Sequence, residues 1–204
     1  MATEATKLEI LNSALRMVGS FHIDADDETS STYEITTRAF SQAVTEVFGD
    51  NIFNYNTKCT TLTGSVSTEF PNYDYEFTFP SDFNIFLLAE NADGYTASNY
   101  RFANGKLYCS EESLKLTYTY IPDLETSASG LPAFLTRLLT LHMAQNMAIE
   151  LSGSENRHEI LFKQYTLALR RARTLEGRQG PAQQYINDGN SQFIGAHQTY
   201  GKVW

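Results

Sequence analysis

Apolar side chains recur at three- and four-residue steps over the first 57 residues and predict two amphipathic helices. Thr6 and Glu9 have the spacing of a capping box, and Gly19 suits a left-handed helix end. Ser31 and Glu34 repeat the capping-box spacing ahead of the second helix. That helix carries the most regular apolar stripe of the chain: Ala39, Phe40, Ala43, Val44, Val47 and Phe48.

From about residue 58 the apolar period changes to two, which predicts β-strands. One run alternates aromatic with polar side chains: Tyr73, Tyr75, Phe77 and Phe79. Asn104-Gly105 lies between two short apolar runs and predicts a hairpin, because both turn positions require a positive φ. A last alternation follows: Leu114, Leu116, Tyr118 and Tyr120. We therefore expect about five or six antiparallel strands in one small sheet with one face toward solvent.

Helical spacing returns over residues 131–176. Between residues 134 and 151 apolar side chains fall on nearly every side, which predicts a central, buried helix that ends at Gly153. A last helix then begins at Ser154-Glu155. Its inward face is predicted to comprise Leu161, Tyr165, Ala168, Ala172 and Leu175.

These patterns predict an α+β fold, in which a helical bundle forms from both ends of the chain around an inserted antiparallel β domain. The predicted parts are the N-terminal helices (1–57), the β domain (58–125), the C-terminal helices (126–176) and an extended arm (177–204).

The arm differs in composition from the rest of the chain. It contains no leucine and much glycine, glutamine and asparagine, yet aromatic residues recur along it. Flexible tails are ordinarily poor in aromatics, so spaced aromatic side chains favour a segment that binds a partner. The candidate partner-binding residues are Tyr185, Phe193, Tyr200 and Trp204.

Composition removes several classes of protein. No apolar run is long enough to span a membrane, and the first residues lack the pattern of a secretory signal. Cys59 and Cys109 are far apart and lack metal-site spacing, which argues against a disulfide scaffold or zinc site and favours a reducing cytosol. The net charge of −9 argues against a protein that coats nucleic acid with its whole surface.

Positive charge concentrates in the last third of this acidic chain, near the end of the last predicted helix. Four arginines are candidate subunit or partner contacts: Arg170, Arg171, Arg173 and Arg178. A solvated helix end is the favoured interpretation of these arginines, ahead of phosphate binding. Contact with an acidic surface of a neighbouring copy is a third interpretation, and a ring of copies would use both charge poles.

No sequence motif of a known catalytic site occurs, and we expect neither a cofactor nor a catalytic residue. Residues 22–28 are the only dense set of metal-type ligands, but they lack the glycine and glutamate of a calcium-binding loop. His142 lies in an apolar stretch, which favours a hydrogen-bonded core residue over a base, and His158 is also helical. Glu111 and Glu112 are expected on opposite faces of one strand.

The order and spacing of several segments resemble the head-to-tail adaptor family of short-tailed phages (podoviruses), also called tail tubular protein A. The resemblance covers roughly residues 8–176, with Phe53 where the family usually has Trp. The segments that carry it are residues 10–19, Phe53-Asn54-Tyr55, residues 75–82, Asn104-Gly105, residues 116–121, Pro132-Ala133-Phe134 and residues 165–172.

The resemblance implies a structural, non-enzymatic virion protein at the junction of head and tail, made in the host cytoplasm. Such adaptors form a ring of twelve copies between the portal protein and the tail nozzle (tail tubular protein B). Genomic DNA passes through the ring without specific binding, and the C-terminal arm reaches the portal. Two alternatives stay open: a metal-dependent phage hydrolase that uses residues 22–28, and a helical nucleic-acid-binding module.

Overall fold

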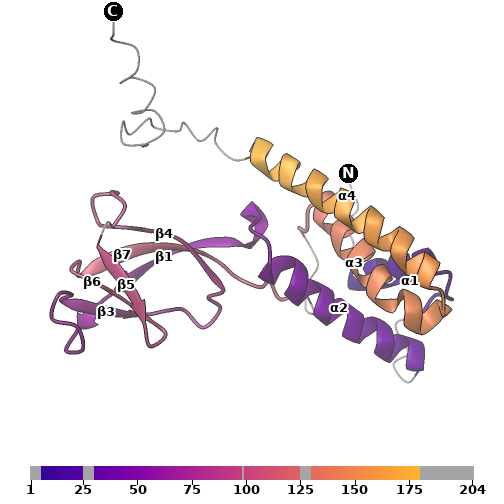
Figure 1. Cartoon of the computed structure of the whole chain (residues 1–204), viewed down its shortest axis with the longest axis horizontal. Helices are drawn as coiled ribbons and strands as arrows, with labels where there is room; N and C mark the ends of the chain where they lie inside the picture. Colours follow the sequence, from indigo (N-terminus) through magenta and orange to yellow (C-terminus); the bar gives the residue numbers. More distant parts are fainter. Residues whose placement is uncertain (1–5, 25–29, 98, 125–129, 180–204) are drawn as a thin grey trace, which may run out of the picture.

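The computed structural model describes residues 6–24, 30–97, 99–124 and 130–179, which form two lobes (Figure 1). Helices from both ends of the chain form the helical lobe, and strands from its middle form the β lobe. Of the residues that the structure describes, 48% are helical and 22% are in strands, so the chain is an α+β protein. The predicted fold class, a bundle with an inserted antiparallel β region, is confirmed.

The helices are α1 (Lys7–Val18), α2 (Ser31–Gly49), α3 (Ala133–Ser152) and α4 (Glu155–Gln179). The predicted capping box of α1 is present, because the Glu9 carboxylate accepts the Thr6 N–H at 2.8 Å and Thr6 Oγ1 accepts the Glu9 N–H. The start predicted for α2 is wrong by one residue. Ser30, and not Ser31, is the N-cap, and its hydroxyl oxygen accepts the Tyr33 N–H at 3.1 Å.

α3 lies at the centre of the helical lobe and packs against α1, α2 and α4 (Figure 1). Its buried side chains lie on all sides, as the apolar pattern predicts. It ends at Gly153, whose φ of 62° is in the left-handed region that favours glycine. α1 ends in the same way at Gly19, with a φ of 79°.

α4 continues to Gln179, past the residue at which the sequence predicts its end. Gly177, the first residue of the predicted arm, costs only about 1 kcal/mol inside a helix. The turn before it is fixed to the rest of the protein, because the Glu176 carboxylate accepts the Asn54 N–H at 3.0 Å. The arm therefore begins later than predicted, and residues 180–204 lie outside the described part of the chain.

The β lobe contains two antiparallel sheets where the sequence predicts one. One sheet has the order β1-β7-β4 and the other the order β2-β3-β6-β5. A core of residues from both sheets, together with Ala97 of the loop between β4 and β5, holds them together: Phe77, Ala89, Ala97, Leu107, Cys109 and Leu114. The strands are β1 (Thr57–Thr63), β2 (Ser65–Val66), β3 (Tyr75–Thr78), β4 (Ile85–Glu90), β5 (Tyr100–Ala103), β6 (Lys106–Cys109) and β7 (Ser113–Thr119).

The strands divide into two sheets at Gly64. It separates β1 from β2, and a Cβ at this position would lie 2.7 Å from the Cβ of Tyr75 and 2.9 Å from a ring carbon of Phe77. Only glycine leaves room for so close an approach, so the chain bends here and passes from one sheet to the other.

A short 3₁₀ turn, η1 (Asn54–Asn56), joins the two lobes. Asn56 is fully buried, and its side-chain amide donates to the backbone oxygen of Phe48 at 3.0 Å, which ties α2 to the first strand. Thr57 and Thr119, the first residue of β1 and the last of β7, lie opposite each other. The chain therefore enters and leaves the β lobe at one place.

Candidate functional site

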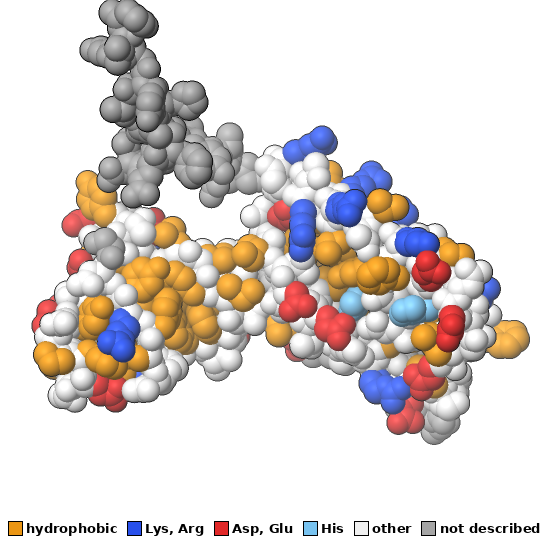
Figure 2. Space-filling view, in the orientation of Figure 1, with side chains coloured by type: hydrophobic (Ala, Val, Ile, Leu, Met, Phe, Trp, Pro, Cys, Tyr) orange, Lys and Arg blue, Asp and Glu red, His pale blue; other side chains and the backbone are white. Residues whose placement is uncertain are grey.

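The four arginines that the sequence singles out do not act as one group. On the face drawn in Figure 2, Lys and Arg side chains gather over the helical lobe, where α4 runs. Arg170, Arg171 and Arg178 are exposed, and their side chains have no hydrogen bond or ion pair with any residue that the structure describes. Arg173 donates to Asn51 Oδ1 at 2.9 Å, across the junction of the lobes. Arg173 is thus a structural contact of α4, and the other three are available to a partner.

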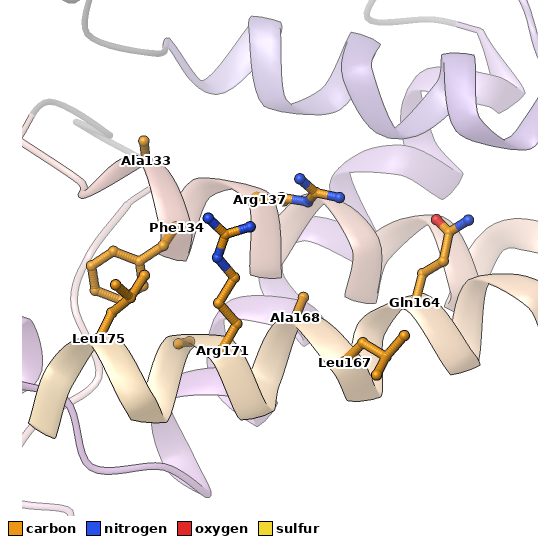
Figure 3. A pocket seen from close by; sticks show the side chains of 9 residues that line it. Ala133, Phe134, Arg137, Gln164, Leu167, Ala168, Arg171 and Leu175 are labelled. Atoms are coloured by element: carbon orange, nitrogen blue, oxygen red, sulfur yellow. The ribbon is translucent and has the colours of Figure 1, made fainter.

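A groove with a volume of about 520 Å³ lies between the start of α3 and the second half of α4 (Figure 3). Phe134 and Leu175 lie together at one end of it. Arg137 from α3 and Arg171 from α4 extend toward the same side. The lining consists of Ala133, Phe134, Arg137, Gln164, Leu167, Ala168, Arg171, Ala172 and Leu175.

The groove combines an apolar lining with uncompensated positive charge. Leu167 is 63% exposed, and burying it would be favourable. Arg137, like Arg171, makes no hydrogen bond or ion pair within the described residues. Carboxylates are natural partners of a guanidinium group, which they bind through paired hydrogen bonds. The groove therefore suits a protein segment that carries both apolar and acidic side chains.

Sequence reasoning missed Arg137, because it lies 33 positions before Arg170, the first of the four arginines that the sequence singles out. One signal could have found it. Arg137 is the only lysine or arginine in α3, a helix whose other side chains are mostly apolar. A charge at such a position marks a part of the helix that the bundle does not cover.

The two helical histidines connect elements of the bundle. His142 is buried, and its Nε2 lies 2.5 Å from Glu46 Oε2 of α2. Its ring also contacts the ring of Tyr165 on α4, with centroids 4.6 Å apart. His158 Nδ1 lies 2.9 Å from the backbone oxygen of Gln145. The prediction that His142 is a hydrogen-bonded core residue is confirmed.

The acidic segment at residues 22–28 is described only in part. His22 and Asp24 are exposed, whereas Asp26, Asp27 and Glu28 lie outside the described residues. Within the described residues, no group of three or more His, Cys, Asp or Glu could hold a metal ion. The aromatic residues proposed for the arm also lie outside the described part: Tyr185, Phe193, Tyr200 and Trp204.

The expectation that Glu111 and Glu112 lie on one strand is wrong. Both lie in the exposed turn between β6 and β7. The turn follows Cys109, whose Sγ accepts the Glu111 N–H at 3.3 Å. Cys59 and Cys109 are both free thiols, which agrees with their predicted lack of pairing. Cys59 is exposed, whereas burial raises the pKa of the Cys109 thiol.

The β lobe carries a cluster of six aromatic rings that sequence reasoning did not identify as a site. Neighbouring ring centroids are 4.1 to 5.9 Å apart. Hydrophobic side chains gather over this lobe in Figure 2. Contiguous exposed apolar surface is typical of binding sites. We call this cluster the aromatic patch; it comprises Phe79, Phe83, Phe86, Tyr100, Phe102 and Tyr118.

Comparison with protein-family models and with curated proteins finds no match to this chain. None of the helices in the described residues is long and apolar enough to cross a membrane. The candidate sites therefore rest on the geometry of the two lobes. They are the arginine-flanked groove between α3 and α4, and the aromatic patch of the β lobe.

Proposed function

We propose that this chain is a structural virion protein, the head-to-tail adaptor of a short-tailed phage. Copies of the chain form a ring, of twelve in the family that it resembles, between the portal protein and the tail nozzle. The ring is part of the conduit for genomic DNA at the junction of head and tail. In this proposal the chain is not an enzyme, and it holds the other proteins in place.

One observation carries the proposal: each lobe presents its own unpartnered surface, and the two surfaces differ in chemistry. The groove of the helical lobe is flanked by Arg137 and Arg171, whereas the patch of the β lobe is aromatic. A connector must hold different neighbours at the same time. Separate surfaces on separate lobes allow this without competition between the neighbours.

The charge of the chain suits a DNA conduit. Its net charge of −9 disfavours lasting contacts with phosphate groups, so DNA can pass without being held. The unpaired arginines near the groove fit an acidic protein surface, including that of a neighbouring copy. A head-to-tail contact of this kind closes into a ring when its rotation is suitable.

The test is the native mass of the full chain by light scattering, alone and mixed with the portal protein of the same phage. We expect a ring of defined size in at least one of the two samples. A monomer that does not bind the portal would contradict the proposal.

Charge-neutralising variants give the test a control. The double variant Arg137→Gln/Arg171→Gln is expected to weaken the ring or the portal complex, because it removes both charges of the groove. Arg16→Gln, at an exposed arginine of α1, is expected to leave assembly unchanged. DNA affinity that falls steeply with salt and disappears in the double variant would instead favour the nucleic-acid-binding alternative.

A further inference from the structure

The aromatic patch is a place where the core of the β lobe reaches the surface. Tyr100 and Phe102 lie on β5 directly opposite Cys109 and Leu107 of β6. Residues that lie opposite each other in an antiparallel pair share a face, and Cys109 and Leu107 are fully buried on that face. Phe102 is nevertheless 46% exposed and Tyr100 37% exposed.

Tyr100 and Phe102 are exposed because both sheets end at the aromatic patch. β5 is the outer strand of one sheet and β4 the outer strand of the other. Phe86 of β4 contacts both Tyr100 and Phe102, at centroid distances of 5.4 and 5.0 Å, so the rings connect the outer strands of the two sheets. Within the described residues, only the last residues of β4 are paired on this side, where the Ala97 N–H donates to the backbone oxygen of Ala89. Tyr100 and Phe102 are the exposed members of the patch, whereas Tyr118 is only 3% exposed. A segment that covered Tyr100 and Phe102 would therefore add to the buried core of the β lobe.

The chemistry of the patch restricts what can cover it. All six side chains are aromatic, and none is charged. Aromatic rings gain from edge-to-face and stacked contacts with other rings as well as from burial. The occupant should therefore be rich in aromatic side chains and nearly free of charge.

One segment of this chain has that composition. Residues 180–204 include four aromatic residues but only two charged ones, Asp188 and Lys202. The same composition makes the segment a poorer match for the groove between α3 and α4, because the two arginines there favour a partner with carboxylates.

The segment starts close enough to reach the patch. The last turns of α4 are held at the junction of the lobes, where the Glu176 carboxylate accepts the Asn54 N–H. The aromatic patch begins near this junction. Its member Tyr118 lies opposite Lys58, near the start of β1, and also opposite Phe86 of β4. The residues that follow Gln179 span up to about 80 Å when extended, at roughly 3.3 Å per residue.

We propose that residues 180–204 dock on the aromatic patch of their own chain. The docked segment covers the open edge of the β lobe and shields its own aromatic side chains from solvent. This inference goes beyond the proposed function and does not rest on it, because it concerns the free chain. A partner that binds the segment must first displace it from the patch.

Trp204 makes the proposal testable, because it is the only tryptophan of the chain. In the full chain we expect its fluorescence emission to be blue-shifted and weakly quenched by acrylamide. Tyr100→Ser/Phe102→Ser should shift the emission to that of solvent-exposed tryptophan and increase quenching several-fold. Phe162→Ser, at a side chain of α4 that is 51% exposed, is the matched control and should change neither property. A fully exposed Trp204 in the unaltered chain would overturn the proposal.

A second measurement needs no change to the patch. Cys59 is exposed on β1, opposite Thr117 and therefore one residue from Tyr118 of the patch, whereas Cys109 is buried. A fluorescent acceptor on Cys59 should receive energy from Trp204 of the same chain. An excess of unlabelled Trp204→Phe chain, which lacks the donor, should leave this transfer unchanged. Transfer that disappears on such mixing would identify a second copy as the donor and would contradict docking within one chain, as would the absence of transfer.

Discussion

At the scale of single residues, the contact between Glu46 and His142 links a buried ring to a carboxylate at the surface of the bundle. Hydrogen bonds from Gln42 and from His142 hold the pKa of the Glu46 carboxyl below its ordinary value, against the opposing effect of burial. A lowered pKa in the folded state means that the ionised form is stabilised by folding.

We therefore predict that Glu46→Gln reduces the pH dependence of stability. The contribution of Glu46 is fully present above its unfolded-state pKa of about 4.3. It is lost as pH falls through the lower folded-state value. The melting temperature, followed from about pH 6 to about pH 3, should fall less in Glu46→Gln than in the unaltered protein. Glu112→Gln, at an exposed carboxylate, is the control and should follow the unaltered protein.

Asn56 is the residue on which the junction of the lobes depends most. Its Oδ1 accepts the Phe53 N–H at 2.8 Å, and its Nδ2 donates to the backbone oxygens of Phe48 and Asn51. All of these contacts are buried. A buried polar group that loses its partner costs about 1–3 kcal/mol.

Asn56→Ala is therefore predicted to lower the free energy of unfolding by about 3 kcal/mol, measured by urea denaturation. Asn54→Ala, in the same turn but with an exposed side chain, should change it by less than about 0.5 kcal/mol. Equal effects of the two substitutions would show that the side-chain contacts of Asn56 do not hold the junction.

Single-residue roles were predictable where the local pattern decides them. An apolar stretch around His142 was enough to predict a hydrogen-bonded core residue. The different roles of Arg171 and Arg173 were not predictable, because they depend on Asn51, which approaches α4 from a distant part of the chain. Arg137 was missed because the groove brings it next to residues of α4 that are distant in sequence.

At the scale of elements, the hairpin between β5 and β6 depends on its turn. Asn104 and Gly105 have φ values of 51° and 71°, as the Asn-Gly pair predicts. A Cβ added to Gly105 would meet no atom within 4 Å, so any effect of a side chain there comes from the backbone conformation alone.

Gly105→Ala is predicted to destabilise the protein by about 1–2 kcal/mol, the cost of a side chain in the left-handed region. Gly49→Ala provides a control of opposite sign. Gly49 also has open space for a Cβ but ends α2 without a positive φ, so alanine should stabilise the helix by about 0.5 kcal/mol. Thermal denaturation of both variants measures the difference, and the same sign for both would contradict it.

Element types were predictable from the sequence more securely than element ends. Ser30, Ser31 and Thr32 are consecutive hydroxyl residues that can all cap a helix, so the sequence alone does not fix which of them does; in the structure it is Ser30. The end of α4 was predicted too early, because the contact that secures its last turns comes from η1.

At the scale of the whole molecule, the two lobes have separate cores. The core of the helical lobe contains no residue of the sheets, and the core of the β lobe contains no residue of the helices. Thr57 and Thr119 lie opposite each other, so the ends of the β lobe are already adjacent.

We predict that residues 57–119 fold in isolation. A chain of about 60 residues is near the lower limit for an independent domain, so its unfolding should be cooperative but weak. Thermal denaturation followed by circular dichroism, with the dispersion of amide proton signals, measures this. In the matched deletion variant a short Gly-Ser link replaces residues 57–119, and α1 to α4 should keep their helical signal. A disordered β peptide would show that the helical lobe holds the sheets together.

The sequence by itself determined the helices, the hairpin and the α+β class, because apolar periodicity, caps and turn residues act within a few positions of the chain. Only the tertiary structure decided the division into two sheets, which follows from the close approach of Tyr75 and Phe77 to Gly64. It also assembled the groove from α3 and α4, and the aromatic patch from both sheets. These surfaces combine side chains that are distant in sequence, and no local pattern specifies which of them meet.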